Sequence, residues 1–188
     1  MSAMALYGQA AAAVLLGAVV TLLPVPRRRL AGALVAIAAL FSLAPVLHGW
    51  MGSPSFTLTQ LALLRLAKPH RSPALGNLPA ALLAALACVF YPLALGVGPF
   101  DPFDLGYRPQ PLLLLLAPIG LWLAWRREDM ALILLGFDLL AYALGLFDNL
   151  LSAFFDPVLV LLAAIRLASQ ARPAALALRG RLSRAVPR

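Results

Sequence analysis

Charge is scarce in this sequence. Only 12% of its 188 residues are Asp, Glu, Lys or Arg, whereas a soluble domain uses roughly a quarter of its residues as charges to solvate its surface. Apolar residues make up 63% and fill successive stretches that approach the ~20 residues needed to cross a bilayer core of ~30 Å. The shortage of charge argues against a soluble domain and predicts an integral membrane protein.

Cysteine and histidine are almost absent, which excludes several chemistries. Cys88 is the only cysteine and lies in an apolar segment, so we expect a packing residue and no intrachain disulfide. His48 and His70 fall on opposite sides of the membrane in the topology derived below, so they cannot together hold a haem. Because glycine-rich phosphate loops, nucleophile elbows and zinc-spaced motifs are also missing, we predict no cofactor, no metal and no catalytic residue, and enzyme activity is not favoured.

Arginine is the one abundant charge. The chain holds fourteen Arg but only one Lys, Lys68, and its net charge is +8. The arginines form short runs between apolar segments, as the positive-inside rule expects, and no basic, aromatic-interleaved surface suggests nucleic-acid binding. With the richness in Ala and Leu, the excess of Arg over Lys is typical of a GC-rich bacterial genome. The arginines predicted to lie on anionic lipids at the cytoplasmic membrane surface are Arg27, Arg28, Arg29, Arg126, Arg127, Arg179, Arg181 and Arg184.

Apolar stretches and breaks predict an all-α, polytopic transmembrane bundle of six to seven helices over residues 1–169. Residues 1–9 carry no positive charge, unlike a cleavable signal peptide, so we expect the first helix to stay in the membrane. Pro45 is expected to kink the second helix. A basic cytoplasmic tail is predicted over 170–188. The predicted helices cover 5–23, 30–50, 54–67, 74–98, 111–125, 130–147 and 150–169.

The short segment 54–67 decides the topology, because it would be only ~21 Å long as a helix. If it is re-entrant, six helices cross, the N-terminus is cytoplasmic, and eleven of fifteen basic residues are cytoplasmic. If it crosses, seven helices do so, the N-terminus is outside, and only Arg108 of the fifteen departs from the positive-inside rule. We favour seven passes. Trp50 and Tyr107 would then lie at the outer interface, and Trp122 and Trp125 at the inner one.

Asp138 is the most informative polar residue. It lies near the centre of the predicted helix 130–147, where a carboxylate costs several kcal/mol unless it is protonated, paired or facing water. We therefore expect it to face protein or water and not lipid. Tyr142, four residues on, shares its helix face and is a candidate hydrogen-bond donor. Asp138 would serve either as an interhelical packing or docking contact or as a group that handles protons or cations.

Asp156 is the second intramembrane carboxylate. The tight connection at residues 148–149 makes the last two helices antiparallel neighbours, so Asp138 and Asp156 could share a proton or flank a polar pocket. The alternative is local, since an Asp directly before Pro157 has the arrangement of a helix N-cap. Residues 101–106 contain two acids, but they lack the ligand pattern of a calcium loop and predict a turn.

These features favour an accessory, assembly or anchoring subunit of a larger inner-membrane complex, with protein subunits as partners. The alternative is a small proton- or cation-coupled transporter that uses Asp138 and Asp156. An integral membrane enzyme acting on a lipid ranks third, because its only candidate polar cluster, residues 126–129, reads as a hairpin turn. A transporter needs a continuous polar path at mid-membrane, whereas a docking subunit can hold one isolated Asp.

Overall fold

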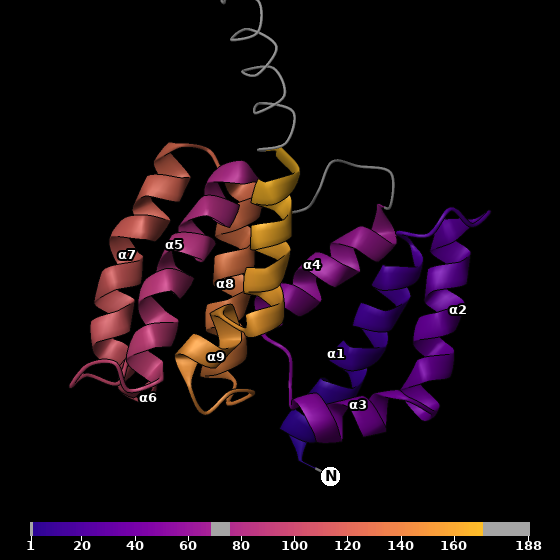
Figure 1. Ribbon diagram of the computed structural model, residues 1–188, viewed down its shortest axis with the longest axis horizontal. Coiled ribbons are helices and arrows are strands. Elements are labelled where there is room, and N and C mark those ends of the chain that lie inside the picture. The colour runs from indigo at the N-terminus through magenta and orange to yellow at the C-terminus, as the bar shows by residue number, and fades with distance from the viewer. Residues whose placement is uncertain (1, 69–75, 171–188) are drawn as a thin grey trace, which may run out of the picture.

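The computed structural model describes residues 2–68 and 76–170 of the chain (Figure 1). All regular structure within these ranges is helical, which confirms the all-α class. The predicted tail beyond Gln170, with its arginines, and His70 lie outside the described residues. The helices are α1 (Ala3–Val20), α2 (Arg28–Phe41), α3 (Ala44–Met51), α4 (Phe56–Ala67), α5 (Asn77–Ala94), α6 (Asp104–Tyr107), α7 (Pro109–Trp125), α8 (Asp129–Ala143), α9 (Leu150–Phe154) and a C-terminal helix, Pro157–Gln170.

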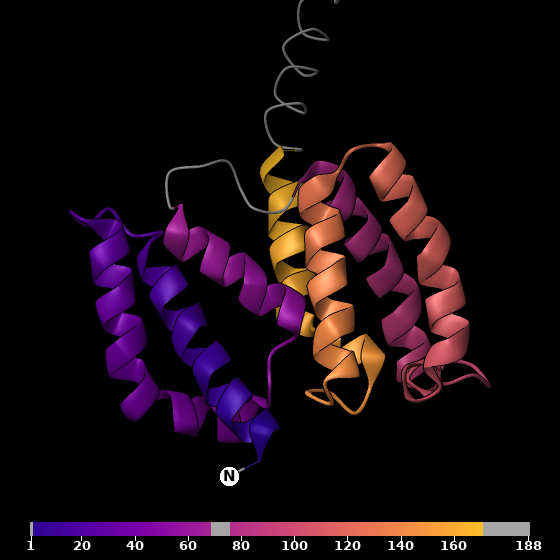
Figure 2. The same cartoon turned by 180° about the vertical axis from the view of Figure 1, so that it is seen from behind.

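The helices form two groups joined by α4. One group consists of α1, α2 and α3, and the other of α5, α7, α8, α9 and the C-terminal helix (Figures 1 and 2). Between them α4 runs obliquely and contacts α1 and α2 on one side and α8 and α9 on the other. The position of α4 therefore sets how the two groups sit against each other.

Small residues hold the first group together. A Cβ atom on Gly17 of α1 would lie 2.5 Å from the Gly32 carbonyl oxygen of α2, and one on Gly32 would lie 2.7 Å from the Gly17 carbonyl oxygen. The two backbones therefore touch, which is how transmembrane helices with small residues at their interface pack. Buried alanines line the same crossing, among them Ala12, Ala13 and Ala39.

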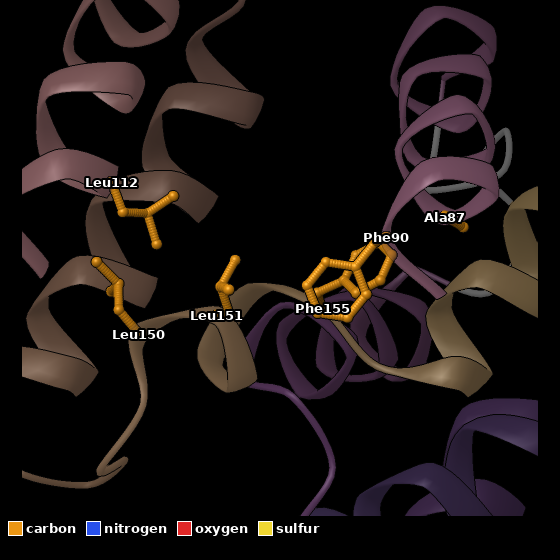
Figure 3. Packing of buried hydrophobic residues seen from close by; sticks show 6 residues of the cluster. All are labelled: Ala87, Phe90, Leu112, Leu150, Leu151 and Phe155. Atoms are coloured by element: carbon orange, nitrogen blue, oxygen red, sulfur yellow. The ribbon is translucent and has the colours of Figure 1, made fainter. Parts of the chain in front are cut away.

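Aromatic and leucine side chains fill the second group. The Phe90 ring of α5 meets the Phe155 ring edge-on, with centroids 5.0 Å apart, and lies 4.9 Å from the Phe103 ring. Asn149 ties the loop before α6 to this core, because its Nδ2 donates to the Phe103 carbonyl at 3.0 Å while its Oδ1 caps α9. The core residues drawn in Figure 3 are Ala87, Phe90, Leu112, Leu150, Leu151 and Phe155.

Several helices are shorter than the sequence predicts. The predicted helix 30–50 is two helices, α2 and α3, bent by 69°, and Pro45 lies in the first turn of α3. The predicted helix 130–147 ends at Ala143, and Gly145 follows with a positive φ of 72°, a conformation that ends helices. The predicted helix 150–169 breaks after α9. Residues 101–106 do form a turn, in which Asp101 Oδ1 accepts from the Phe103 amide at 2.9 Å before α6 starts.

These breaks limit the number of helices that meet a membrane-spanning length. In the described part of the chain, α1 and α5 are long and apolar enough to cross a bilayer, and the bent pair α2–α3 adds a third if it counts as one span. At 1.5 Å per residue, the 17 residues of α7 reach ~25 Å and the 12 of α4 ~18 Å. The predicted count of six to seven spans is not confirmed by helix length and composition.

The two ends of the molecule differ in charge. The α1–α2 connection, the end of α4, the α7–α8 connection and the end of the C-terminal helix lie at one end, which we call the basic end (Figures 1 and 2). The N-terminus, α3, α6 and α9 lie at the opposite end. The elements at the basic end carry all basic residues of the described ranges except Arg108, namely Arg27, Arg28, Arg29, Arg65, Lys68, Arg126, Arg127 and Arg166.

Much of the outer surface is apolar. Trp50 is 85% exposed on α3, and Trp125 is 79% exposed at the end of α7. Leucines and isoleucines on α2, α5, α7 and α8 are also half or more exposed. An apolar surface of this extent is unfavourable in water and is typical of a surface that meets lipid or another protein.

Candidate functional site

Asp138 lies inside the protein, in the middle of α8. Its side chain is 2% exposed. Oδ2 accepts a hydrogen bond from Thr57 Oγ1 at 2.6 Å, and Oδ1 accepts one from Gln60 Nε2 at 2.8 Å. Asp138 thus faces protein, as expected for a carboxylate in an apolar helix.

Both donors come from the first turns of α4. Thr57 and Gln60 are three residues apart, so they share one face of the helix. Gln60 Nε2 also donates to the Leu134 carbonyl at 3.2 Å, one turn before Asp138 on α8. The sequence holds an indication of this contact, because Thr57 and Gln60 stand three residues apart in a largely apolar segment. Two polar side chains on one helix face suggest a polar partner on a neighbouring helix, and Asp138 is that partner.

Asp156 joins two helix starts. Its Oδ1 accepts from the Leu159 amide at 2.8 Å, which confirms the predicted N-cap of the C-terminal helix. Its Oδ2 accepts from the Ser55 amide at 2.8 Å. Ser55 is itself the N-cap of α4, where its Oγ accepts from the Leu58 amide at 3.2 Å. One carboxylate therefore links the start of α4 to the start of the C-terminal helix.

We call Ser55, Thr57, Gln60, Asp138 and Asp156 the α4 network. Each of the four carboxylate oxygens in it accepts one hydrogen bond, and three of the four donors belong to α4 or its cap. The three bonds from α4 and its cap bridge 78 to 101 residues of sequence. The network fixes α4 against the second group of helices.

Tyr7 of α1 fixes α4 against the first group. Its hydroxyl donates to the Pro54 carbonyl at 2.9 Å and lies 2.8 Å from Thr59 Oγ1. The Tyr7 ring packs against Phe56 and Phe147, with centroids 5.7 and 5.2 Å away. The start of α4 is therefore held by side chains from both groups.

Two predicted pairings do not form. Tyr142 makes no hydrogen bond to Asp138 and packs in the apolar clusters with Leu150 and Phe147, because α4 supplies the donors for both carboxylate oxygens. Asp138 and Asp156 form no hydrogen bond with each other, and each accepts from its own donors. The sequence places both carboxylates near the last helices, and the structure brings donors from α4 or its cap to each of them.

A groove runs beside the α4 network. It lies between α4 and α8, has a volume of about 320 Å³, and has Gln60 as its one polar lining residue. Gln60 therefore both lines the groove and binds the Asp138 carboxylate. The apolar lining residues are Phe56, Leu63, Leu64, Met130, Ile133, Leu134 and Phe137.

The predicted surface arginines of the described residues lie in two connections between helices. At the α1–α2 connection, Arg27, Arg28 and Arg29 line a hollow of about 410 Å³. At the α7–α8 connection, the Arg126 guanidinium lies 5.7 Å from the centre of the Trp122 ring, and Arg127 is followed by two acids. The predicted surface residues Arg179, Arg181 and Arg184 lie outside the described residues.

Residues 2–68 and 76–170 contain no group of three or more His, Cys, Asp or Glu side chains placed to hold a metal ion. Comparison of the chain with protein-family models, with curated proteins and with solved structures gives no match.

Proposed function

We propose that this chain is an accessory, assembly or anchoring subunit of a larger complex in a bacterial inner membrane. The observation that carries the proposal is the α4 network. Its carboxylates bind donors of the same chain and hold α4 against the second group, while Tyr7 holds α4 against the first. Together these bonds keep the two helical groups in one arrangement. Hydrogen bonds between helices fix their positions in lipid, where apolar burial does little. A body of fixed shape with an apolar outer surface suits a role in docking.

The topology proposed with it has seven passes, with the N-terminus outside and the C-terminus in the cytoplasm. The longer helices run in turn towards the basic end and back from it, with α3, α6 and α9 lying at the opposite end (Figure 1). The helices that run between the ends are α1, α2, α4, α5, α7, α8 and the C-terminal helix. The positive-inside rule then assigns the basic end to the cytoplasm. Trp50 and Tyr107 belong to elements of the opposite end, and Trp122 and Trp125 to the last turn of α7 at the basic end, as interfacial aromatic belts require.

Helix α4 crosses obliquely in this proposal despite its 12 residues. The extended residues before it and local thinning of the bilayer make up its length at modest cost. The tail, residues 170–188, is proposed to lie on the anionic cytoplasmic leaflet.

Reporter fusions test the topology. A reporter active only outside the cytoplasm should be active at the N-terminus and inactive at Arg188. An inactive reporter at the N-terminus would place the N-terminus in the cytoplasm. That result would favour six passes with a re-entrant α4.

Purification tests the accessory role. The chain is expressed at its native level, extracted in a mild detergent and isolated with whatever membrane subunits accompany it. We expect one set of integral membrane partners at fixed stoichiometry in both the wild type and Asp138→Asn. A chain that purifies alone, at every detergent concentration that keeps it folded, would contradict the proposal.

The second candidate is a proton- or cation-coupled transporter, and one observation favours it. Both α4 and the C-terminal helix begin at a carboxylate, since Asp156 accepts from the Ser55 amide before α4 and from the Leu159 amide of the C-terminal helix, and Asp138 accepts from Thr57 in the first turn of α4. Transporters build their sites at such broken helices near mid-membrane. Flux measured in vesicles separates the candidates, because Asp138→Asn can accept and donate hydrogen bonds but cannot release a proton. Loss of flux with an intact complex would favour the transporter. A lipid-directed enzyme remains third, since it rests on the 126–129 turn alone.

A further inference from the structure

The α1–α2 turn concentrates positive charge that no acidic side chain of the described residues neutralises. Arg27, Arg28 and Arg29 line its hollow together with Val25 and Leu30. In the part of the chain that the structure describes, no acid forms an ion pair with these three guanidinium groups. The segments outside that part contain no Asp or Glu. Acidic side chains of this chain therefore do not supply the counterions of these arginines.

The α7–α8 turn at the same end of the molecule carries no net charge. Arg126 and Arg127 are followed directly by Glu128 and Asp129, so this turn is formally neutral. Arg126 also lies over the Trp122 ring. The two turns share their place in the fold and differ in net charge, which makes the α7–α8 turn a matched control.

An apolar stripe leads away from the arginines along α2. Leu30 is 52% exposed, and Leu34, Ile37 and Phe41 follow on the same helix face with still larger exposed fractions. Their spacing of four, three and four residues keeps them in one line. From Leu30 to Phe41 the stripe is ~16 Å long at 1.5 Å per residue, which is about the thickness of one leaflet of a ~30 Å hydrocarbon core.

We propose that the α1–α2 turn and the exposed stripe of α2 bind an anionic phospholipid, with its phosphate among Arg27, Arg28 and Arg29 and an acyl chain along Leu30, Leu34, Ile37 and Phe41. Guanidinium groups pair well with phosphate oxygens. A free phosphate would use only the arginines, whereas a phospholipid also covers the stripe. The inference rests on the proposed membrane insertion, with the basic end at a membrane surface.

Native mass spectrometry of the full chain in a mild detergent tests the site. Dioleoyl phosphatidylglycerol should stay bound to the wild type, and dioleoyl phosphatidylcholine should not. Arg27→Gln, Arg28→Gln and Arg29→Gln should each weaken retention by roughly fivefold, which corresponds to ~1 kcal/mol per basic residue at an anionic surface. The control pair Arg126→Gln/Arg127→Gln should weaken retention by less than any of these single variants, because Glu128 and Asp129 already balance the charge of that turn. Each arginine is replaced singly, because a variant that lacks all three and fails to fold would give no result.

Three results would overturn the proposal. An equal loss of phosphatidylglycerol retention in the control pair would mean that the whole basic end attracts anionic lipid, with no specific site at the α1–α2 turn. Equal retention of phosphatidylcholine would remove the role of the arginines. Displacement of the lipid by equimolar inorganic phosphate would mean an anion site without the stripe. Resistance to extraction by alkaline carbonate is measured in the source membranes, so failure of membrane insertion is distinguished from failure of lipid binding.

Discussion

Replacement of Asp138 by leucine tests whether the α4 network holds the fold. The change removes the acceptor for Thr57 Oγ1 and Gln60 Nε2. Gln60 keeps its bond to the Leu134 carbonyl at 3.2 Å, whereas Thr57 keeps only the Ala153 carbonyl at 3.5 Å. Interhelical hydrogen bonds in membranes average ~0.6 kcal/mol each. With two bonds lost, we expect the free energy of unfolding to fall by about 1–2 kcal/mol, a factor of roughly 5–30 in the ratio of folded to unfolded protein.

Asp138→Asn should behave differently. The asparagine carbonyl can accept from Gln60, and its amide can donate to Thr57 Oγ1, whose hydroxyl hydrogen then turns to the Ala153 carbonyl. We expect the free energy of unfolding to stay within ~0.5 kcal/mol of wild type. The same limit applies to the control Tyr142→Phe, because that hydroxyl makes no hydrogen bond to the network.

Equilibrium unfolding of the detergent-solubilised protein in dodecyl sulfate, followed by tryptophan fluorescence and circular dichroism, measures these effects. A double-mutant cycle of Asp138→Leu with Gln60→Leu isolates the pair, with an expected coupling of ~0.6 kcal/mol and at most ~1.7. The reasoning fails if Asp138→Leu is as stable as wild type. It fails equally if Tyr142→Phe costs as much as Asp138→Leu.

Two further substitutions test other contacts by the same unfolding assay. Gly17→Leu should lower the free energy of unfolding by at least ~1–3 kcal/mol, because its Cβ would meet the Gly32 carbonyl oxygen at 2.5 Å. The control is Gly136→Leu on α8, where nothing lies within 4 Å of the added Cβ. Equal effects of the two substitutions would contradict the close α1–α2 crossing. Asp156→Ala should lower the free energy of unfolding by ~1–2 kcal/mol, because it removes the helix cap and the acceptor for the Ser55 amide. Asp156→Asn should keep most of this stability. An alanine variant as stable as wild type would contradict both roles of Asp156, the cap and the link to Ser55.

Local features of the candidate site were predictable from the sequence. The Asp156–Pro157 step signals a helix start by itself, because the capping bond reaches only three residues along the chain. The burial of Asp138 follows from the cost of a carboxylate in hydrocarbon. Its partners did not follow, because Tyr142 and Thr57 are both reasonable donors and only the placement of α4 selects between them.

The amino-acid sequence by itself determined the helical class and the apolar character, because backbone polar groups in an apolar chain must pair within helices. The order of its residues also showed the runs of arginine between the apolar segments. Tertiary structure decided where the helices break and what the acids bind. The 69° bend between α2 and α3 and the break before Pro157 depend on packing as well as on proline. The bonds from α4 to Asp138 and Asp156 join residues 78 to 101 positions apart, and no periodicity within one helix specifies which distant helix lies against it.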